Sequence, residues 1–156
     1  MNSTVTEELL DSIDISIKNI TNFSNISDLE KAYLAKYLVV FISGVYEETI
    51  ETIMNEKVEE LKSKRISKYV ASTIRYNFQN PKIGKVVSLL NTFDDEWGRR
   101  IDQMPDVNKT ALGNIVTHKN DIAHGNSFEV TLRAVIKWYE DSRKIIEKID
   151  EMVFKE

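Results

Sequence analysis

The sequence predicts a single all-α domain, a helical bundle with a long central helix and a long C-terminal helix. Three observations favour this fold class. Apolar residues recur at helical spacing along almost the whole chain. Five glycines and two prolines in 156 residues leave few of the turns that a β-protein needs. Hydrophobic residues make up 42% of a chain whose length suits one domain, so residues 1–156 are expected to share one core.

Two helices are expected in the N-terminal half. A helix over 5–22 places four aliphatic residues on one face, namely Leu9, Ile13, Ile17 and Ile20. Ser27 and Glu30 have the spacing of a capping box, in which each satisfies a backbone N–H of the other. They are expected to open the longest helix, over 28–63.

This long helix is predicted to be the most buried element. Between Tyr33 and Val45 it is apolar around most of its circumference, with one stripe on Leu34, Leu38 and Val45 and a second on Tyr33, Tyr37, Val40 and Gly44. Gly44 is expected to mark a close helix crossing, with a local kink as the alternative.

Five further helices are expected, over 67–78, 82–90, 94–104, 106–118 and 128–154. Asp94, Asp95 and Glu96 are interpreted as helix-start chemistry, and Ser127 is expected to cap the last helix. That helix has a seam with steps of three and four, on Leu132, Val135, Tyr139, Ser142, Ile146, Ile149 and Val153. The seam suits packing against the helix from Asp28, and a homodimer seam is the alternative.

Composition restricts the functional classes. The net charge of −4 and pI near 5.3 argue against a domain that grips long duplex nucleic acid through many phosphates. The chain has no cysteine, its first residues do not resemble a secretory signal, and no apolar run approaches a membrane span. The expected location is the cytoplasm, with no membrane partner.

Two cationic segments have alternative interpretations. A basic stretch on Lys57, Lys62, Lys64, Arg65, Lys68 and Arg75 either guides RNA or is a solvated face interleaved with glutamates, and the second is more usual. Arg99 and Arg100 after Trp97 resemble a platform for single-stranded RNA, but Trp97 is more simply a core anchor.

The segment with the clearest chemical potential ends the helix predicted over 106–118. Both histidines of the chain, His118 and His124, lie there, with Lys119 and Asp121 between them. Histidine suits proton transfer near neutral pH, and an adjacent cation stabilises phosphoryl charge. Lys119 and His124 are about 140° apart on an ideal helix, so they meet only if the helix ends between them or a second protomer completes the site.

Two plainer interpretations remain open for this segment. His118 and Asp121 can share a helix face as metal ligands, but no third ligand lies nearby in sequence, so neither a metal nor another cofactor is expected. His124 can also be a buried or capping histidine that hydrogen-bonds a helix end.

The segment from Lys119 to Gly125, Lys-Asn-Asp-Ile-Ala-His-Gly, resembles the Arg-x4-6-His motif of the HEPN superfamily. Flanking stretches resemble the RiboL-PSP-type branch, at 38–50, 78–81, 88–97 and 135–141. The resemblance covers about 29–152. It implies a helical bundle that dimerises and brings two motifs together, often in metal-independent endoribonucleases of toxin–antitoxin and antiphage systems.

The resemblance also implies roles for single residues. His124 is expected to be the general acid or base, Lys119 to take the place of the phosphate-binding arginine, and Asn120 to match the polar residue after it. His118 and Asp121 are secondary candidates for RNA contacts. Lys119 departs from the motif because lysine lacks the planar fork of arginine. The expected partners are RNA, a second copy and a cognate antitoxin or defence-system protein. The alternative is a non-catalytic interaction or regulatory subunit.

Overall fold

A computed structural model describes residues 1–126 and 129–155, and every structural statement below refers to these residues. They form α-helices and no strand. The helices are α1 (Thr4–Thr21), α2 (Asp28–Glu59), α3 (Lys64–Asn77), α4 (Ile83–Asn91), α5 (Asp95–Asp102), α6 (Asp106–Ala123) and α7 (Leu132–Lys155). The predicted all-α class is confirmed. No helix in the described part of the chain is long and apolar enough to cross a membrane.

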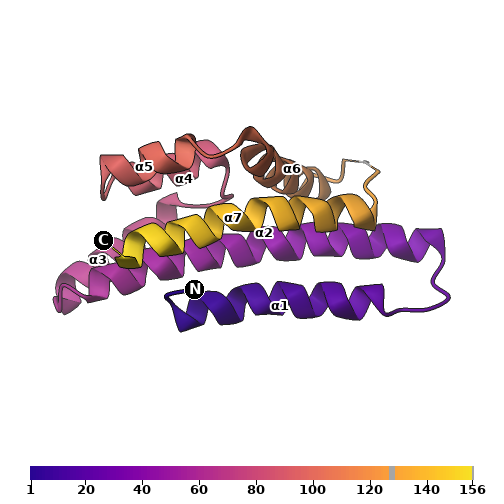
Figure 1. Ribbon diagram of the computed structural model, residues 1–156, viewed down its shortest axis with the longest axis horizontal. Helices are drawn as coiled ribbons and strands as arrows, with labels where there is room; N and C mark the ends of the chain where they lie inside the picture. Colours follow the sequence, from indigo (N-terminus) through magenta and orange to yellow (C-terminus); the bar gives the residue numbers. More distant parts are fainter. Residues whose placement is uncertain (127–128, 156) are drawn as a thin grey trace.

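The centre of the bundle is the pair α2 and α7, which lie side by side along the long axis (Figure 1). The predicted seam of α7 is buried from Val135 to Val153, and α2 is one of the helices it packs against. Inside the core, the Tyr46 hydroxyl lies 2.9 Å from Ser142 Oγ and joins the two helices. The prediction that α7 pairs with α2 is confirmed, and the homodimer-seam alternative is wrong because the seam is already covered.

The remaining helices cover the central pair from two sides. Helix α1 runs along α2, and α6 packs against both α2 and α7 (Figure 1). The N-terminus is fastened to α7, since the backbone N–H groups of Asn2 and Ser3 donate to the buried carboxylate of Asp150 at 2.7 and 3.1 Å. Helices α4 and α5 pack on one another and close the end of the bundle that lies away from the start of α7.

Helix starts follow the sequence closely. The predicted capping box of α2 is present, with Ser27 accepting from the Glu30 N–H and Glu30 accepting from the Ser27 N–H. Asp94 caps α5 by accepting from the Glu96 N–H at 2.8 Å. The interpretation of these acidic residues as helix-start chemistry is confirmed.

Several predicted helix ends are wrong by a turn. Helix α2 ends at Glu59 instead of Ser63, because Lys62 adopts a left-handed conformation with φ of 53°. Helix α3 begins at Lys64 instead of Ser67.

The last two helices differ more. Helix α6 continues to Ala123, five residues beyond the predicted end at His118. Helix α7 begins at Leu132, where the Thr131 hydroxyl accepts from the Ala134 N–H at 3.2 Å. The predicted cap at Ser127 and start at Phe128 lie outside the described residues.

One face of α2 contradicts the predicted burial. The stripe that includes Gly44 is exposed, whereas the neighbouring stripe is buried at Leu38, Ile42 and Val45. We call the exposed set the α2 stripe: Leu29, Tyr33, Tyr37, Val40 and Gly44. Apolar spacing predicts the helix correctly, but it does not reveal whether a partner helix covers each face.

Within the described part of the protomer the predicted close crossing at Gly44 is also wrong, because none of these residues lies within 4 Å of the position that a Cβ would take there. The glycine that permits a close crossing is Gly98 of α5. A Cβ on Gly98 would collide with the side chain of Asn91 and the carbonyl of Val87, both on α4. Glycine is therefore required where α5 meets α4.

Candidate functional site

The candidate site lies at the carboxyl end of α6, which closes in a Schellman motif. The Gly125 N–H donates to the Ile122 carbonyl at 3.1 Å, and the Asn126 N–H donates to the Asp121 carbonyl at 2.9 Å. Gly125 has φ of 72°, a conformation that costs glycine little. The predicted helix break at Gly125 and Asn126 is thus confirmed, and it sets the position of His124 as the last residue before the turn.

Lys119 is held by a contact that was not predicted. Its Nζ donates to Asn80 Oδ1 at 2.5 Å, and the Asn80 backbone N–H donates to Glu47 Oε2 at 2.7 Å. Asn80 has φ of 57°, which turns the short loop between α3 and α4 toward α6. This network of Glu47, Asn80 and Lys119 joins α2, the loop and α6. Nothing in the spacing of these residues, which are far apart in sequence, signals it.

His124 is the C-cap residue of α6, and its side chain is exposed. Its backbone N–H donates to the Asn120 carbonyl at 3.0 Å, so the residue closes the helix with its backbone. The alternative of a buried histidine is therefore wrong, whereas the alternative of a capping histidine is borne out by this backbone hydrogen bond. An exposed imidazole at a helix end is accessible to a substrate or to another chain.

Lys119 and His124 do not share a face within one chain. Because α6 continues to Ala123, the helix does not end between them, and the two side chains leave it about 140° apart. Lys119 is directed toward Asn80, whereas His124 stands at the exposed end. The two residues therefore do not meet through an end of the helix between them. A second protomer is the other way in which they could meet.

The remaining candidates stabilise the helix end. His118 stacks on Trp138 of α7, with ring centroids 5.0 Å apart, and its Nδ1 lies 3.7 Å from Asp121 Oδ2. Asp121 Oδ1 also accepts from Asn126 Nδ2 at 3.3 Å. Asn120 is half-buried one residue beyond Lys119. His118 and Asp121 thus have contacts within the protomer that account for their positions.

No group of three or more His, Cys, Asp or Glu side chains in the described ranges is placed to hold a metal ion. His118 and Asp121 are neighbours, as their spacing predicts, but this part of the structure adds no third ligand to them.

The second cationic segment is engaged elsewhere. Trp97 is buried in the core, which confirms its interpretation as a core anchor. Arg99 and Arg100 both donate to Glu96, and these guanidiniums lower the pKa of Glu96 to about 2. The charges of the pair are thus turned toward their own helix.

The α2 stripe leads directly to the Lys119 network. Glu47 follows Val40 by seven residues and Gly44 by three, so it shares their face of α2. The amino half of α2, the carboxyl end of α6 and the start of α7 lie at the same end of the bundle (Figure 1). The exposed apolar stripe and the segment that carries Lys119 and His124 therefore lie at the same end of the bundle.

An all-α bundle with a helix end that resembles the Arg-x4-6-His motif is typical of HEPN domains, a class whose members commonly act on RNA and dimerise. The family model described as RiboL-PSP-HEPN matches residues 5–154, and the chain belongs to this family. No curated protein and no solved structure matches the chain.

Proposed function

We propose that this protein is a metal-independent endoribonuclease that acts on cytoplasmic RNA as a homodimer. The observation that carries the proposal is the end of α6, where a RiboL-PSP-HEPN chain presents an exposed His124 five residues after a positioned Lys119. An imidazole and an ammonium are sufficient for cleavage that uses the 2′-hydroxyl of RNA as nucleophile.

In the proposed reaction, one imidazole accepts the proton of the ribose 2′-OH. The 2′-oxygen then forms a bond to the adjacent phosphorus, and the bond from phosphorus to the 5′-oxygen breaks. The imidazolium formed in this way, or water, then gives a proton to the leaving 5′-oxygen, so one His124 is sufficient at each site. The products are a 2′,3′-cyclic phosphate and a 5′-hydroxyl, and no metal is needed to balance the step.

Lys119 is proposed to bind the scissile phosphate. An ammonium has three N–H donors, and one of them is used on Asn80 Oδ1, so two remain for phosphate oxygens. Asn80 thereby fixes the direction of a side chain that otherwise has many rotamers. Asn120 is proposed to assist as a polar neighbour, with His118 and Asp121 as secondary RNA contacts.

The dimer is proposed to form through the α2 stripe. Leu29, Tyr33 and Tyr37 are exposed large apolar side chains on one face, which is unusual for a surface that stays in water. A twofold contact there would bring the two α6 ends near one another, because the stripe leads to Glu47. Lys119 of one protomer could then work with the partner's His124.

The first test is induced expression in a bacterial host, with wild type beside His124→Ala. Growth arrest and RNA fragmentation with wild type, both absent with His124→Ala at equal protein level, support the proposal. The purified protein should cut RNA in excess EDTA, and the fragments should carry cyclic phosphate ends. Intact RNA with purified wild type and with Lys119→Arg would contradict it.

A second test asks whether the site is shared between protomers. Lys119→Ala and His124→Ala are each expected to be inactive. Mixed in equal amounts and allowed to exchange, they should regain about a quarter of the wild-type rate, because half of the dimers hold one complete site. No recovery on mixing would place Lys119 and His124 in the same chain and contradict the shared site.

One observation favours a second candidate, a non-catalytic interaction or regulatory subunit. The contact of Lys119 with Asn80 and Glu47 is sufficient to explain a lysine at this position as a structural tie. In that case Lys119→Ala lowers Tm without changing any RNA. For an active toxin, by contrast, we expect a cognate antitoxin or defence-system partner, detectable as a protein whose co-expression restores growth.

A further inference from the structure

Positive charge is segregated to one part of this acidic protein. Residues 61–93 contain seven lysines and arginines and no aspartate or glutamate. Of the 21 basic residues, 14 are left for the rest of the chain, which holds all 25 acidic residues and so has a net charge of −11. The glutamates that lie among the basic residues all precede residue 61. The expected solvated face of mixed positive and negative charge is therefore found only before α3.

The cations of this segment are available to a ligand. Within the described part of the chain, none of the seven forms an ion pair with a carboxylate. Arg75 differs from the others because it lines a surface with Glu48 and Glu51 of α2. Lys82 and Lys85 are both exposed, and Lys85 lines the groove between α3 and α4.

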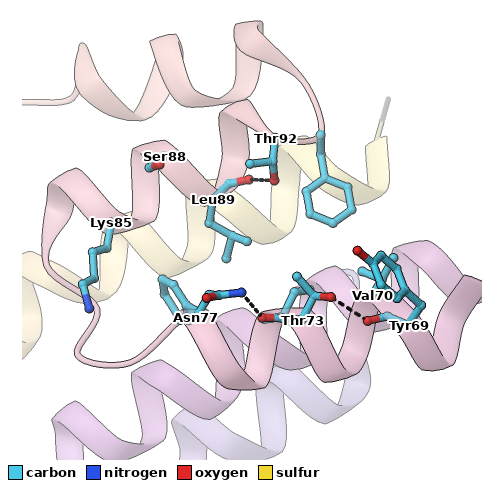
Figure 2. Close-up of a pocket in the computed structure, with 11 residues that line it drawn as sticks. Tyr69, Val70, Thr73, Asn77, Lys85, Ser88, Leu89 and Thr92 are labelled. Carbon is cyan, nitrogen blue, oxygen red and sulfur yellow. Dashed lines mark hydrogen bonds between the residues drawn. The ribbon is translucent and has the colours of Figure 1, made fainter.

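A groove of about 520 Å³ runs between α3 and α4, a volume typical of ligand pockets. Figure 2 shows Leu89 of α4 directed into this α3–α4 groove, with Lys85 at one end and Tyr69 at the other. The buried side chains of Ile74 and Phe78 contribute to its lining. The groove is therefore apolar inside and cationic at one end.

Three of the polar side chains along the walls already donate to backbone carbonyls. The Thr73 and Thr92 hydroxyls donate to the carbonyls of Tyr69 and Leu89, and Asn77 Nδ2 donates to the Thr73 carbonyl (Figure 2). A ligand held here would gain stacking and apolar contact and few bonds to its polar edges. Such contacts tolerate different bases.

Aromatic residues stand among the cations on the exposed rim. Tyr69 and Tyr76 are 72% and 83% exposed, far more than tyrosines that support a core. Arg65, Tyr69 and Tyr76 are spaced by four and seven residues, so they share one face of α3. Phe93 also lines the groove. Aromatic faces between cations are the features by which proteins bind single-stranded nucleic acid without base readout.

One loop connects the groove to the candidate site. The loop that connects α3 to α4 holds Asn80, which binds Lys119, and Lys85 Nζ donates to the Gln79 carbonyl in the same loop. Lys85 and Lys119 thus contact neighbouring residues of one loop. An acidic peptide would explain the charge and the apolar lining, but it would not explain why the loop beside the groove also holds the proposed phosphate-binding residue.

We infer that the α3–α4 groove is the docking surface for single-stranded RNA, with bases stacked on Tyr69 and Phe93 and phosphates on Lys82 and Lys85. This inference rests on the proposed ribonuclease function, since it names the form of RNA that the same protein takes. It adds a surface outside the Lys119–His124 segment and predicts that unpaired RNA is preferred to duplex.

The test measures binding without cleavage, so it is independent of catalysis. Fluorescence anisotropy with the full chain carrying His124→Ala uses a labelled single-stranded oligoribonucleotide of about twelve nucleotides. Lys82→Glu with Lys85→Glu should weaken binding at least about tenfold and lower the salt slope by about one to one and a half, because two phosphate contacts are lost. Tyr69→Ala should weaken binding about tenfold.

Matched controls change the same chemistry elsewhere. Lys18→Glu with Lys144→Glu alters two exposed lysines on α1 and α7, and Phe23→Ala removes an exposed aromatic residue outside the groove. Both should change the affinity less than about twofold. Photo-crosslinking is a measurement that needs no variant of the groove. A thiouridine-containing oligonucleotide should crosslink to residues 61–93.

Three results would overturn the inference. The first is equal weakening by groove and control variants, and the second is crosslinking confined to other segments. The third is that the protein does not bind RNA at low salt but does bind an acidic amphipathic helical peptide, and that Tyr69→Ala abolishes the peptide binding. This result would make the groove a protein-docking site. Binding in the groove without cleavage by the protein carrying His124 would instead reject the proposed nuclease and keep the docking surface.

Discussion

Replacing Tyr33 by aspartate places a charge in the middle of the exposed α2 stripe. Tyr33 is 64% exposed, and an aromatic side chain buries 150–250 Å² when fully covered, so about 130 Å² of it is available to a partner. At about 25 cal/mol per Å², covering this area contributes about 3 kcal/mol per protomer. A twofold dimer contains the contact twice.

Even if half of this area is covered, Tyr33→Asp should raise the dimer Kd by at least about a hundredfold, and the buried carboxylate adds a further penalty. The fold should be unaffected because the residue faces solvent in the protomer. Sedimentation velocity over a concentration series measures the effect. Tyr76→Asp is the matched control, since Tyr76 is also highly exposed, on α3, but lies outside the α2 stripe.

The reasoning also predicts a linked loss of function. Tyr33→Asp should lose RNA cleavage although Lys119 and His124 are unchanged, and Tyr76→Asp should keep its dimer. A wild-type protein that remains monomeric at high concentration would refute the dimer. So would a Tyr33→Asp protein with an unchanged Kd, which would show that another surface pairs the two copies.

Three further predictions concern stability, each measured by thermal unfolding. Tyr46→Phe removes the buried contact with Ser142 and should lower the free energy of unfolding by about 1 kcal/mol, which corresponds to a fall in Tm of a few degrees. An unchanged Tm would show that this hydrogen bond does not stabilise the core. Asp150→Ala leaves the Ser3 N–H without its buried acceptor and should cost about 1–3 kcal/mol, with proteolysis at the N-terminus as an independent readout. Burial raises the pKa of Glu51 above its ordinary 4.5, so the charged form of this side chain is disfavoured in the folded state. Glu51→Gln should therefore raise Tm at pH 7. The gain in Tm should vanish as the pH falls below about 4, where the carboxyl is protonated in both states.

Local features of the sequence were sufficient for most of the fold. The capping box at Ser27 and Glu30 fixes where α2 begins. The seam with steps of three and four from Val135 to Val153 identifies the face of α7 that packs in the core. Helix ends were less predictable. Lys62 ends α2 through its backbone conformation, and α6 continues past His118 although its last residues are mostly polar.

The site was predictable as a segment but not as an arrangement. The pair Lys119 and His124 stands out in sequence, and the helix end after His124 follows from Gly125. The contact between Lys119 and Asn80 depends on a loop folding back over 39 residues, which no local pattern encodes. The exposure of Tyr33 was equally hidden, because an exposed apolar residue at helical spacing has the same character in the sequence as one in the core.

The separation of charge between residues 61–93 and the rest of the chain makes the molecule an electric dipole. A protein with a pI near 5.3 is expected to pass through a cation exchanger at pH 7, yet this one should be retained there by its α3–α4 flank. Two copies that approach flank to flank repel one another at low salt. The proposed dimer would therefore have to form through another face, such as the uncharged, apolar α2 stripe.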